Sequence, residues 1–214
     1  MNRVRPSRLF AAVAAAFALG LSAGAAAYPD KPVQYIIPFP AGGESDIAAR
    51  LQAVTFSQKF KQEMVVINRA GAGGALVWQQ LNGYPNDGYT IAGINLPHIV
   101  LQPLEGTVSY KTEEMTPVYF FHYTPDALIV PSDSPYKTFQ DFIKAAKDKP
   151  GTLNIAGSSF NSANHAAHEK MGREFGIKTT YVPFKGTGDL FLMIRRPPRS
   201  TLFPYTTLAI QQKG

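Results

Sequence analysis

The first residues that could do chemistry are two glycines with small polar neighbours, in residues 39–46, Phe-Pro-Ala-Gly-Gly-Glu-Ser-Asp. This loop lies between a short apolar run and a helical pattern that begins at Ile47. Glycine lets the backbone approach a ligand closely, and the first N–H groups of a helix are available to a negative charge. Ser45 or Asp46 is predicted to cap the helix. The spacing predicts an anion-receiving loop and leaves the anion open.

Two more loops follow apolar runs in the first half of the chain. Residues 68–74, Asn-Arg-Ala-Gly-Ala-Gly-Gly, precede a helical pattern, and residues 95–98 follow a third apolar run. If the three runs are parallel strands, the loops share the edge where ligands bind in open α/β sheets. Gly73 and Asn95 are the candidate contacts in these two loops.

The second half of the chain offers two further loops of this kind. Residues 157–165 contain Ser158 and Ser159, whose hydroxyl and backbone N–H groups could donate to a carboxylate. Residues 183–189 contain Lys185, which is either a point charge for an anion or an ordinary solvated lysine. Both loops follow a predicted strand and precede a helical pattern.

The elements that must position these loops form a βαβαβ alternation in the first half, with strands expected at residues 33–39, 64–67 and 89–94. The Ser-Asp-Ser-Pro cluster at residues 132–135 is the expected boundary region between two lobes. Beyond the first half, further strands are predicted at residues 118–123, 127–130, 153–156 and 179–182. One helix is predicted at residues 139–147, with Thr138 as its cap, and another follows the loop at 157–165 and ends at residue 175.

The ends of the chain carry its positive charge. Three arginines precede an apolar run at residues 9–21 and small residues at 25–27, which predicts a secretory signal peptide over residues 1–27; a membrane anchor is the alternative. Residues 28–190 hold 14 Lys and Arg against 15 Asp and Glu. The formal charge of +6 therefore does not belong to the folded domain, and we expect no nucleic-acid partner.

Several catalytic and metal chemistries lack the residues they need. The chain has no cysteine, which excludes disulfides, thiolate metal sites and a cysteine nucleophile. His165 and His168 are spaced for one helix face, but no second set of metal ligands accompanies them. Ser158 or Ser159 with His165 and Glu169 would resemble a hydrolase, yet no Gly-x-Ser-x-Gly elbow is present. We expect no cofactor, because residues 71–74 depart from a dinucleotide fingerprint.

Four motifs together resemble one family, the periplasmic substrate-binding receptors of tripartite tricarboxylate transporters, also called Bug proteins. They are Pro-Phe-Pro-Ala-Gly-Gly-x-x-Asp at residues 38–46, Asn-x-x-Gly-Ala-Gly-Gly at 68–74, the Pro-Gly, Ala-Gly-Ser-Ser and His series at 150–165, and Val-Pro-Phe-Lys-Gly at 182–186. The resemblance covers residues 28–189. Each motif is weak by itself, and jointly they are specific.

The resemblance implies a two-lobed α/β Venus-flytrap fold that closes on a small organic anion, commonly a carboxylate, without catalysis. It implies a periplasmic, monomeric receptor that presents its ligand to membrane permease subunits; a sensor for a signalling partner is the alternative. Asp46 is expected to shape its loop, since like charges repel. The ligand-binding positions carried over are Ala41, Gly42, Gly43 and Asp46 on the first lobe, and Ser158, Ser159, His165, Lys185 and Thr187 on the second.

The last segment departs from this family. The expected division is a signal peptide at 1–27, a first lobe at 28–128, an incomplete second lobe at 129–190 and a non-native tail at 191–214. Residues 203–208, Phe-Pro-Tyr-Thr-Thr-Leu, resemble the translation of a common sequencing adapter, and residues 209–214 do not continue that frame. Pro197 and Pro198 oppose the helix expected there. We therefore expect a truncated receptor.

Overall fold

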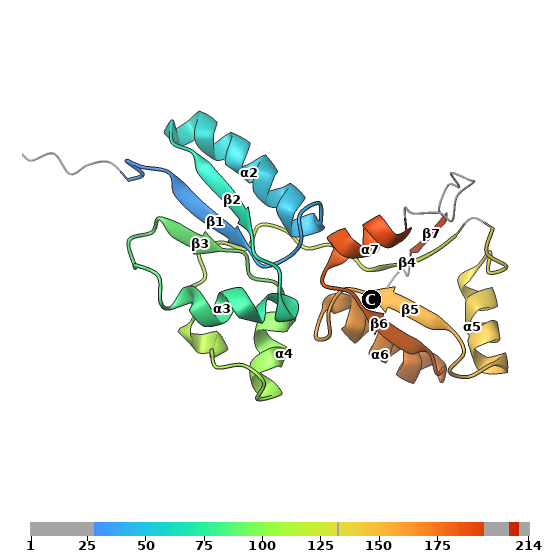
Figure 1. Ribbon diagram of the computed structural model, residues 1–214. Coiled ribbons are helices and arrows are strands. Elements are labelled where there is room, and N and C mark those ends of the chain that lie inside the picture. The colour runs from blue at the N-terminus through green and yellow to red at the C-terminus, as the bar shows by residue number, and fades with distance from the viewer. Residues whose placement is uncertain (1–27, 132, 195–205, 210–214) are drawn as a thin grey trace, which may run out of the picture.

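Two α/β groups of elements lie side by side in the computed structural model, which describes residues 28–131, 133–194 and 206–209 (Figure 1). The first lobe comprises residues 33–114, and the second lobe comprises residues 127–194 together with 206–209. The predicted signal peptide and most of the predicted tail lie outside the described residues. Within the described part, no helix is long and apolar enough to cross a membrane.

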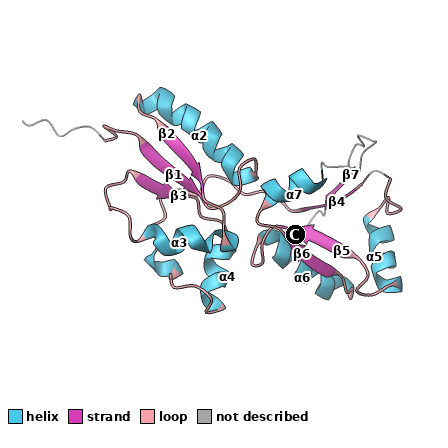
Figure 2. Ribbon diagram, viewed as in Figure 1, coloured by secondary structure: helices cyan, strands magenta, loops and turns pink. Residues whose placement is uncertain are grey.

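The first lobe is built on a parallel sheet of three strands, in the order β2-β1-β3. The central strand β1 is almost wholly buried, as its continuous apolar sequence predicts. The predicted βαβαβ alternation is confirmed (Figure 2). The elements are β1 (Val33–Ile37), α2 (Glu44–Phe60), β2 (Met64–Asn68), η1 (Ala72–Gly74), α3 (Ala75–Leu81), β3 (Thr90–Ala92), α4 (His98–Leu104) and η2 (Thr112–Glu114).

The core of the first lobe centres on Trp78, whose side chain is fully buried. Its indole Nε1 donates to the carbonyl oxygen of Gly93 at 2.9 Å, so the one polar atom of the ring is satisfied. The rings of Phe39 and Tyr110 meet it edge to face. Helix α3 is thereby fixed to the end of β3, close to two of the predicted ligand loops.

The second lobe is smaller. Strands β5 and β6 form a parallel pair, and β4 pairs antiparallel with β7. A compact cluster of Phe142, Ala146, Met171 and Ile177 forms its core. The elements are β4 (Ala127–Val130), α5 (Phe139–Asp148), β5 (Asn154–Gly157), α6 (Ala163–Phe175), β6 (Thr180–Pro183), α7 (Thr187–Ile194) and β7 (Thr206–Ala209).

Two sequence predictions about elements were wrong, and one helix was not predicted. Residues 118–123 are not a strand: they pair with no described strand, and Val118 and Tyr123 are each 83% exposed. Helix α4 follows the predicted loop at residues 95–98 and was not itself predicted. Helix α7 continues to Ile194, where a break was expected from residue 191, because leucine and methionine there favour a helix and the prolines come later.

Candidate ligand-binding site

The opening loop ends at helix α2, which begins one turn earlier than its sequence pattern predicts. Gly43 is the N-cap, so the prediction that Ser45 or Asp46 caps the helix was wrong. Asp46 instead lies in the first turn and accepts a hydrogen bond from the Gly42 N–H at 2.9 Å. Gly42 has φ of +77°, a left-handed conformation that glycine adopts without strain.

Asp46 is a structural residue of this loop. Its carboxylate is buried, and Oδ1 lies 2.9 Å from Nη2 of Arg50, one helical turn away. Burial would raise the pKa of Asp46, but hydrogen bonds from Arg50, Gly42 and Asn68 together hold that pKa below its usual value. The negative charge is therefore already matched inside the loop, as expected for a residue that shapes the site.

The opening loop touches the start of α7 on the second lobe, where Figure 1 shows the two lobes meeting. The backbone N–H of Glu44 donates to Oγ1 of Thr187 at 3.4 Å. The backbones of Ala41 and Gly43 lie against Gly188. Two predicted site segments, 143 residues apart, are thus brought together.

A second contact between the lobes joins His98 to Ser159. His98 Nε2 and Ser159 Oγ lie 3.0 Å apart, and a Cβ placed on Gly73 would lie 2.9 Å from the same hydroxyl. His98 is buried against the rings of Phe39 and Trp78. Burial lowers the pKa of His98 to about 4, so the imidazole is neutral at pH 7.

One further polar contact ties the lobes together beside the predicted loops, and two others hold the connecting segment to the opening loop. Asn161 Nδ2 donates to Oε2 of Glu105 at 2.7 Å. Glu44 accepts hydrogen bonds from His122 and from Thr124, both in the segment that passes from one lobe to the other. Glu44 therefore links the opening loop to that connecting segment.

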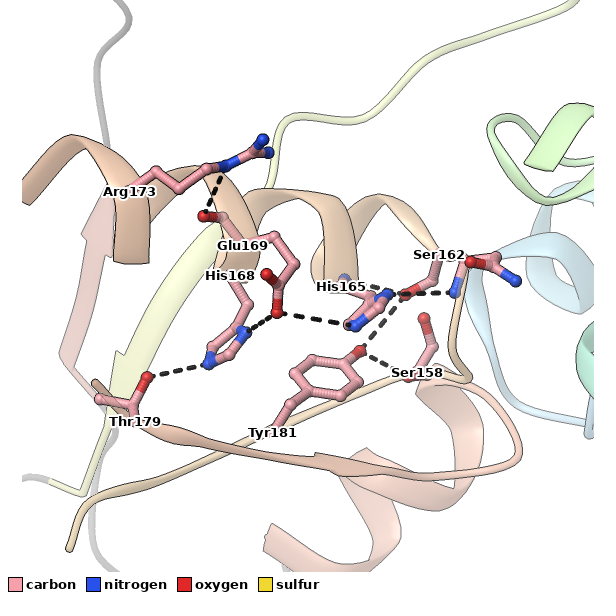
Figure 3. A network of polar contacts seen from close by, with 9 residues as sticks. Ser158, Ser162, His165, His168, Glu169, Arg173, Thr179 and Tyr181 are labelled. Carbon is pink, nitrogen blue, oxygen red and sulfur yellow. Dashed lines mark hydrogen bonds and ion pairs between the residues drawn. The ribbon is translucent and has the colours of Figure 1, made fainter. Parts of the chain in front are cut away.

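The second-lobe candidates Ser158 and His165 belong to a network around Tyr181 (Figure 3). The Tyr181 hydroxyl donates to the Ser158 carbonyl oxygen at 2.5 Å, and its ring packs against the imidazole of His165. The ring also packs against His168, whose Nε2 lies 2.8 Å from the hydroxyl of Thr179. The network fixes the loop after β5 to strand β6.

The described residues do not have the serine–histidine geometry that a hydrolase needs. The Ser158 hydroxyl donates to Asn164 Oδ1 at 2.8 Å, and Ser159 faces His98. His165 accepts the Asn161 N–H at Nδ1, and its Nε2 lies 3.9 Å from Glu169. Among the described residues, neither serine hydroxyl is hydrogen-bonded to His165, and no group of three His, Asp or Glu is placed to hold a metal ion.

The remaining candidates, Asn95 and Lys185, lie in different surroundings. Asn95 donates from Nδ2 to the Ser45 hydroxyl at 3.2 Å, which places it beside the opening loop. Lys185 is exposed. Sequence reasoning missed His98, Glu105 and Asn161; of these, His98 could have been found, because it closes the predicted loop at residues 95–98.

The arrangement brings two helix N-termini face to face. Helix α2 begins at Glu44 and helix α7 begins at Thr187, and the N–H of the one donates to the side chain of the other. Each N-terminus carries a partial positive charge and N–H groups that are not used within the helix. A small anion between them would be stabilised from both sides.

The fold and this interface define a two-lobed α/β binding protein whose loops meet across the lobe boundary. Solved structures agree with that class: the chain is 32% identical, with a TM-score of 0.72, to a structure described as a periplasmic transporter, over 76% of this chain and 55% of that one. MatC from Rhodopseudomonas palustris with bound malate is 26% identical, with a TM-score of 0.62, over 77% of this chain and 57% of MatC.

The family follows from the sequence match. Residues 48–195 match the tripartite tricarboxylate transporter family receptor, and the chain belongs to this family of receptors. Protein BugT of Bordetella pertussis is 30% identical over 191 residues, 88% of this chain and 59% of BugT. The predicted resemblance and the α/β fold class are confirmed. The chain spans about half the length of the curated relatives it matches.

Proposed function

We propose that this protein is a periplasmic receptor that captures a small organic acid, a di- or tricarboxylate, and presents it to the permease subunits of a tripartite tricarboxylate transporter. The observation that carries the proposal is the meeting of the α2 and α7 N-termini at Glu44 and Thr187. Membership of the receptor family and the malate bound to MatC support the same ligand class.

The chemistry of the interface favours a carboxylate over a cation. The two acids of the opening loop are already engaged, Asp46 by Arg50 and Glu44 by His122 and Thr124. What the loops offer a ligand is mainly donors, namely backbone N–H groups and the hydroxyls of Ser159 and Thr187. Each hydrogen bond to a charged carboxylate oxygen is stronger than one between neutral groups.

Calorimetric titration tests this proposal directly. The chain is titrated with malate, adipate and citrate, and we expect heat of binding with at least one of them. Thr187→Ala should weaken that binding roughly tenfold, since one charge-assisted contact or one closure contact is lost.

The matched control is Thr152→Ala, because Thr152 is an exposed threonine of the same lobe whose hydroxyl bonds to the Lys149 carbonyl. It should leave the affinity unchanged. The absence of binding to all three acids, or equal effects of the two substitutions, would contradict the proposal.

A further inference from the structure

The two lobes touch through bare backbone where the opening loop meets the start of α7. A Cβ atom placed on Gly188 would lie 2.8 Å from the carbonyl oxygen of Ala41 and 3.0 Å from the backbone nitrogen of Gly43. A Cβ placed on Gly186 would lie 2.8 Å from Cδ of Pro40. Contacts this short are not tolerated against backbone or against the rigid ring of a proline, so the lobes reach this separation only because both positions lack a side chain.

The same holds from the opposite side. A Cβ on Gly43 would lie 3.1 Å from the backbone nitrogen of Gly188 and 3.2 Å from Oγ1 of Thr187. Glycine therefore faces glycine across the lobe boundary. The hydrogen bond from the Glu44 N–H to Thr187 is formed at this place and depends on the same close approach.

The second lobe itself does not require glycine at positions 186 and 188. Neither residue has a left-handed φ, and beyond their own chain neighbours the three atoms nearest to a Cβ added at either position all belong to residues 39–43 of the first lobe. Gly73, by contrast, has φ of +59° and would be strained by any side chain whatever its neighbours. The need for glycine at 186 and 188 arises in the opposite lobe.

We propose that Gly186 and Gly188 are positioning residues that set how far the lobes close, and hence whether Thr187 reaches the opening loop. The inference deepens the proposed function, on which its effect on ligand affinity rests. Alanine at position 188 would hold the lobes apart and weaken ligand binding without damaging either lobe. Alanine also favours a helix over glycine, so the second lobe should not lose thermal stability.

The distance between the lobes provides a test that needs no ligand. Because the chain has no cysteine, spin labels can be attached through Gln58→Cys on α2 and Lys147→Cys on α5, both exposed. Pulsed electron paramagnetic resonance should show one defined label-to-label distance in the parent chain. With Gly188→Ala or Gly186→Ala, the population at that distance should fall, while the melting temperature stays the same or rises.

The matched control is Gly172→Ala, a glycine inside helix α6 of the same lobe, where an added Cβ would meet only the Ile177 carbonyl at an ordinary 3.4 Å. It should change neither the distance nor the affinity. An unchanged label-to-label distance in Gly188→Ala, or an equal change in Gly172→Ala, would overturn the inference.

Ligand affinity adds a second readout, with malate as the probe. Gly188→Ala should bind malate roughly tenfold more weakly than the parent chain, within the range typical of conformational coupling. If the parent chain binds no organic acid, the proposed function fails, and the label distances still decide the inference about the glycines. Normal malate affinity in Gly188→Ala would count against it.

Discussion

The two lobes carry similar glycine- and hydroxyl-containing loops, but the hydrophobic cores and sheets that hold these loops differ in size. In the described residues the first lobe buries eleven hydrophobic side chains in one cluster around Trp78, whereas the second buries four around Phe142. The first lobe has a three-stranded parallel sheet, and the corresponding parallel sheet of the second lobe has two strands. Since stability scales with buried apolar area, the second lobe should have the lower free energy of unfolding.

The largest effect is expected when the core of the stronger lobe is broken. Trp78→Ala removes a fully buried indole and its hydrogen bond to Gly93, and should lower the free energy of unfolding by about 3–5 kcal/mol. Urea unfolding followed by far-UV circular dichroism measures this loss. Tyr119→Ala is the control, because Tyr119 is 81% exposed and its removal should cost little. Equal losses in the two variants would contradict the assigned core.

A smaller loss, confined to one lobe, is expected from Phe142→Ala, at about 3 kcal/mol. The chain has a single tryptophan, and it lies in the first lobe, so its fluorescence reports on that lobe while circular dichroism reports on both. The variant should separate the two unfolding curves, with the dichroism change at lower urea. Coincident curves would show that the lobes unfold as one unit and would contradict the expected difference in stability between them.

The smallest effect is a pH dependence that belongs to the first lobe. Burial lowers the pKa of His98 from 6.5 to about 4, so between these values the unfolded chain binds more protons than the folded one. The contribution of neutral His98 to the free energy of unfolding is therefore fully present above pH 6.5, and it is lost as the pH falls toward 4. Tryptophan-monitored unfolding at pH 7.5 and 4.5 should show a loss of about 2 kcal/mol from this residue.

His98→Gln is the matched variant for that measurement, because glutamine keeps a polar group of similar reach to Ser159 and does not titrate. Between pH 7.5 and 4.5 its free energy of unfolding should fall by about 2 kcal/mol less than that of the parent chain. If the two chains show the same pH dependence, His98 is not the group responsible.

Local features of this fold could be predicted from the sequence because they depend on neighbours in the chain. Thr138 was expected to cap a helix, and its hydroxyl does accept the N–H of Asp141 at 3.1 Å. The bounds of α3 follow from glycines before it and a helical pattern within it. The meeting of the Thr187 loop with the opening loop followed from the resemblance to a two-lobed family, which supplied the topology.

Individual side-chain contacts between distant segments could not be predicted. Asn161 and Glu105 are 56 residues apart, and nothing in either local pattern indicates that they form a hydrogen bond. The apolar residues 118–123 suggested a strand because periodicity shows which side chains prefer burial, and it does not show whether a partner strand exists. The glycines at 186 and 188 were visible, but their purpose depends on atoms of the other lobe.

The exposed segment at residues 118–123, Val-Tyr-Phe-Phe-His-Tyr, has a consequence for how the protein behaves in concentrated solution. It combines high β-propensity with no acidic residue and no lysine or arginine, and it is flanked by Pro117 and Pro125. Such a segment can pair with its copy in another molecule, and prolines at its ends limit how far that pairing spreads. The hydrogen bonds from His122 and Thr124 to Glu44 hold one end of the segment to helix α2, and we expect their loss to favour self-association.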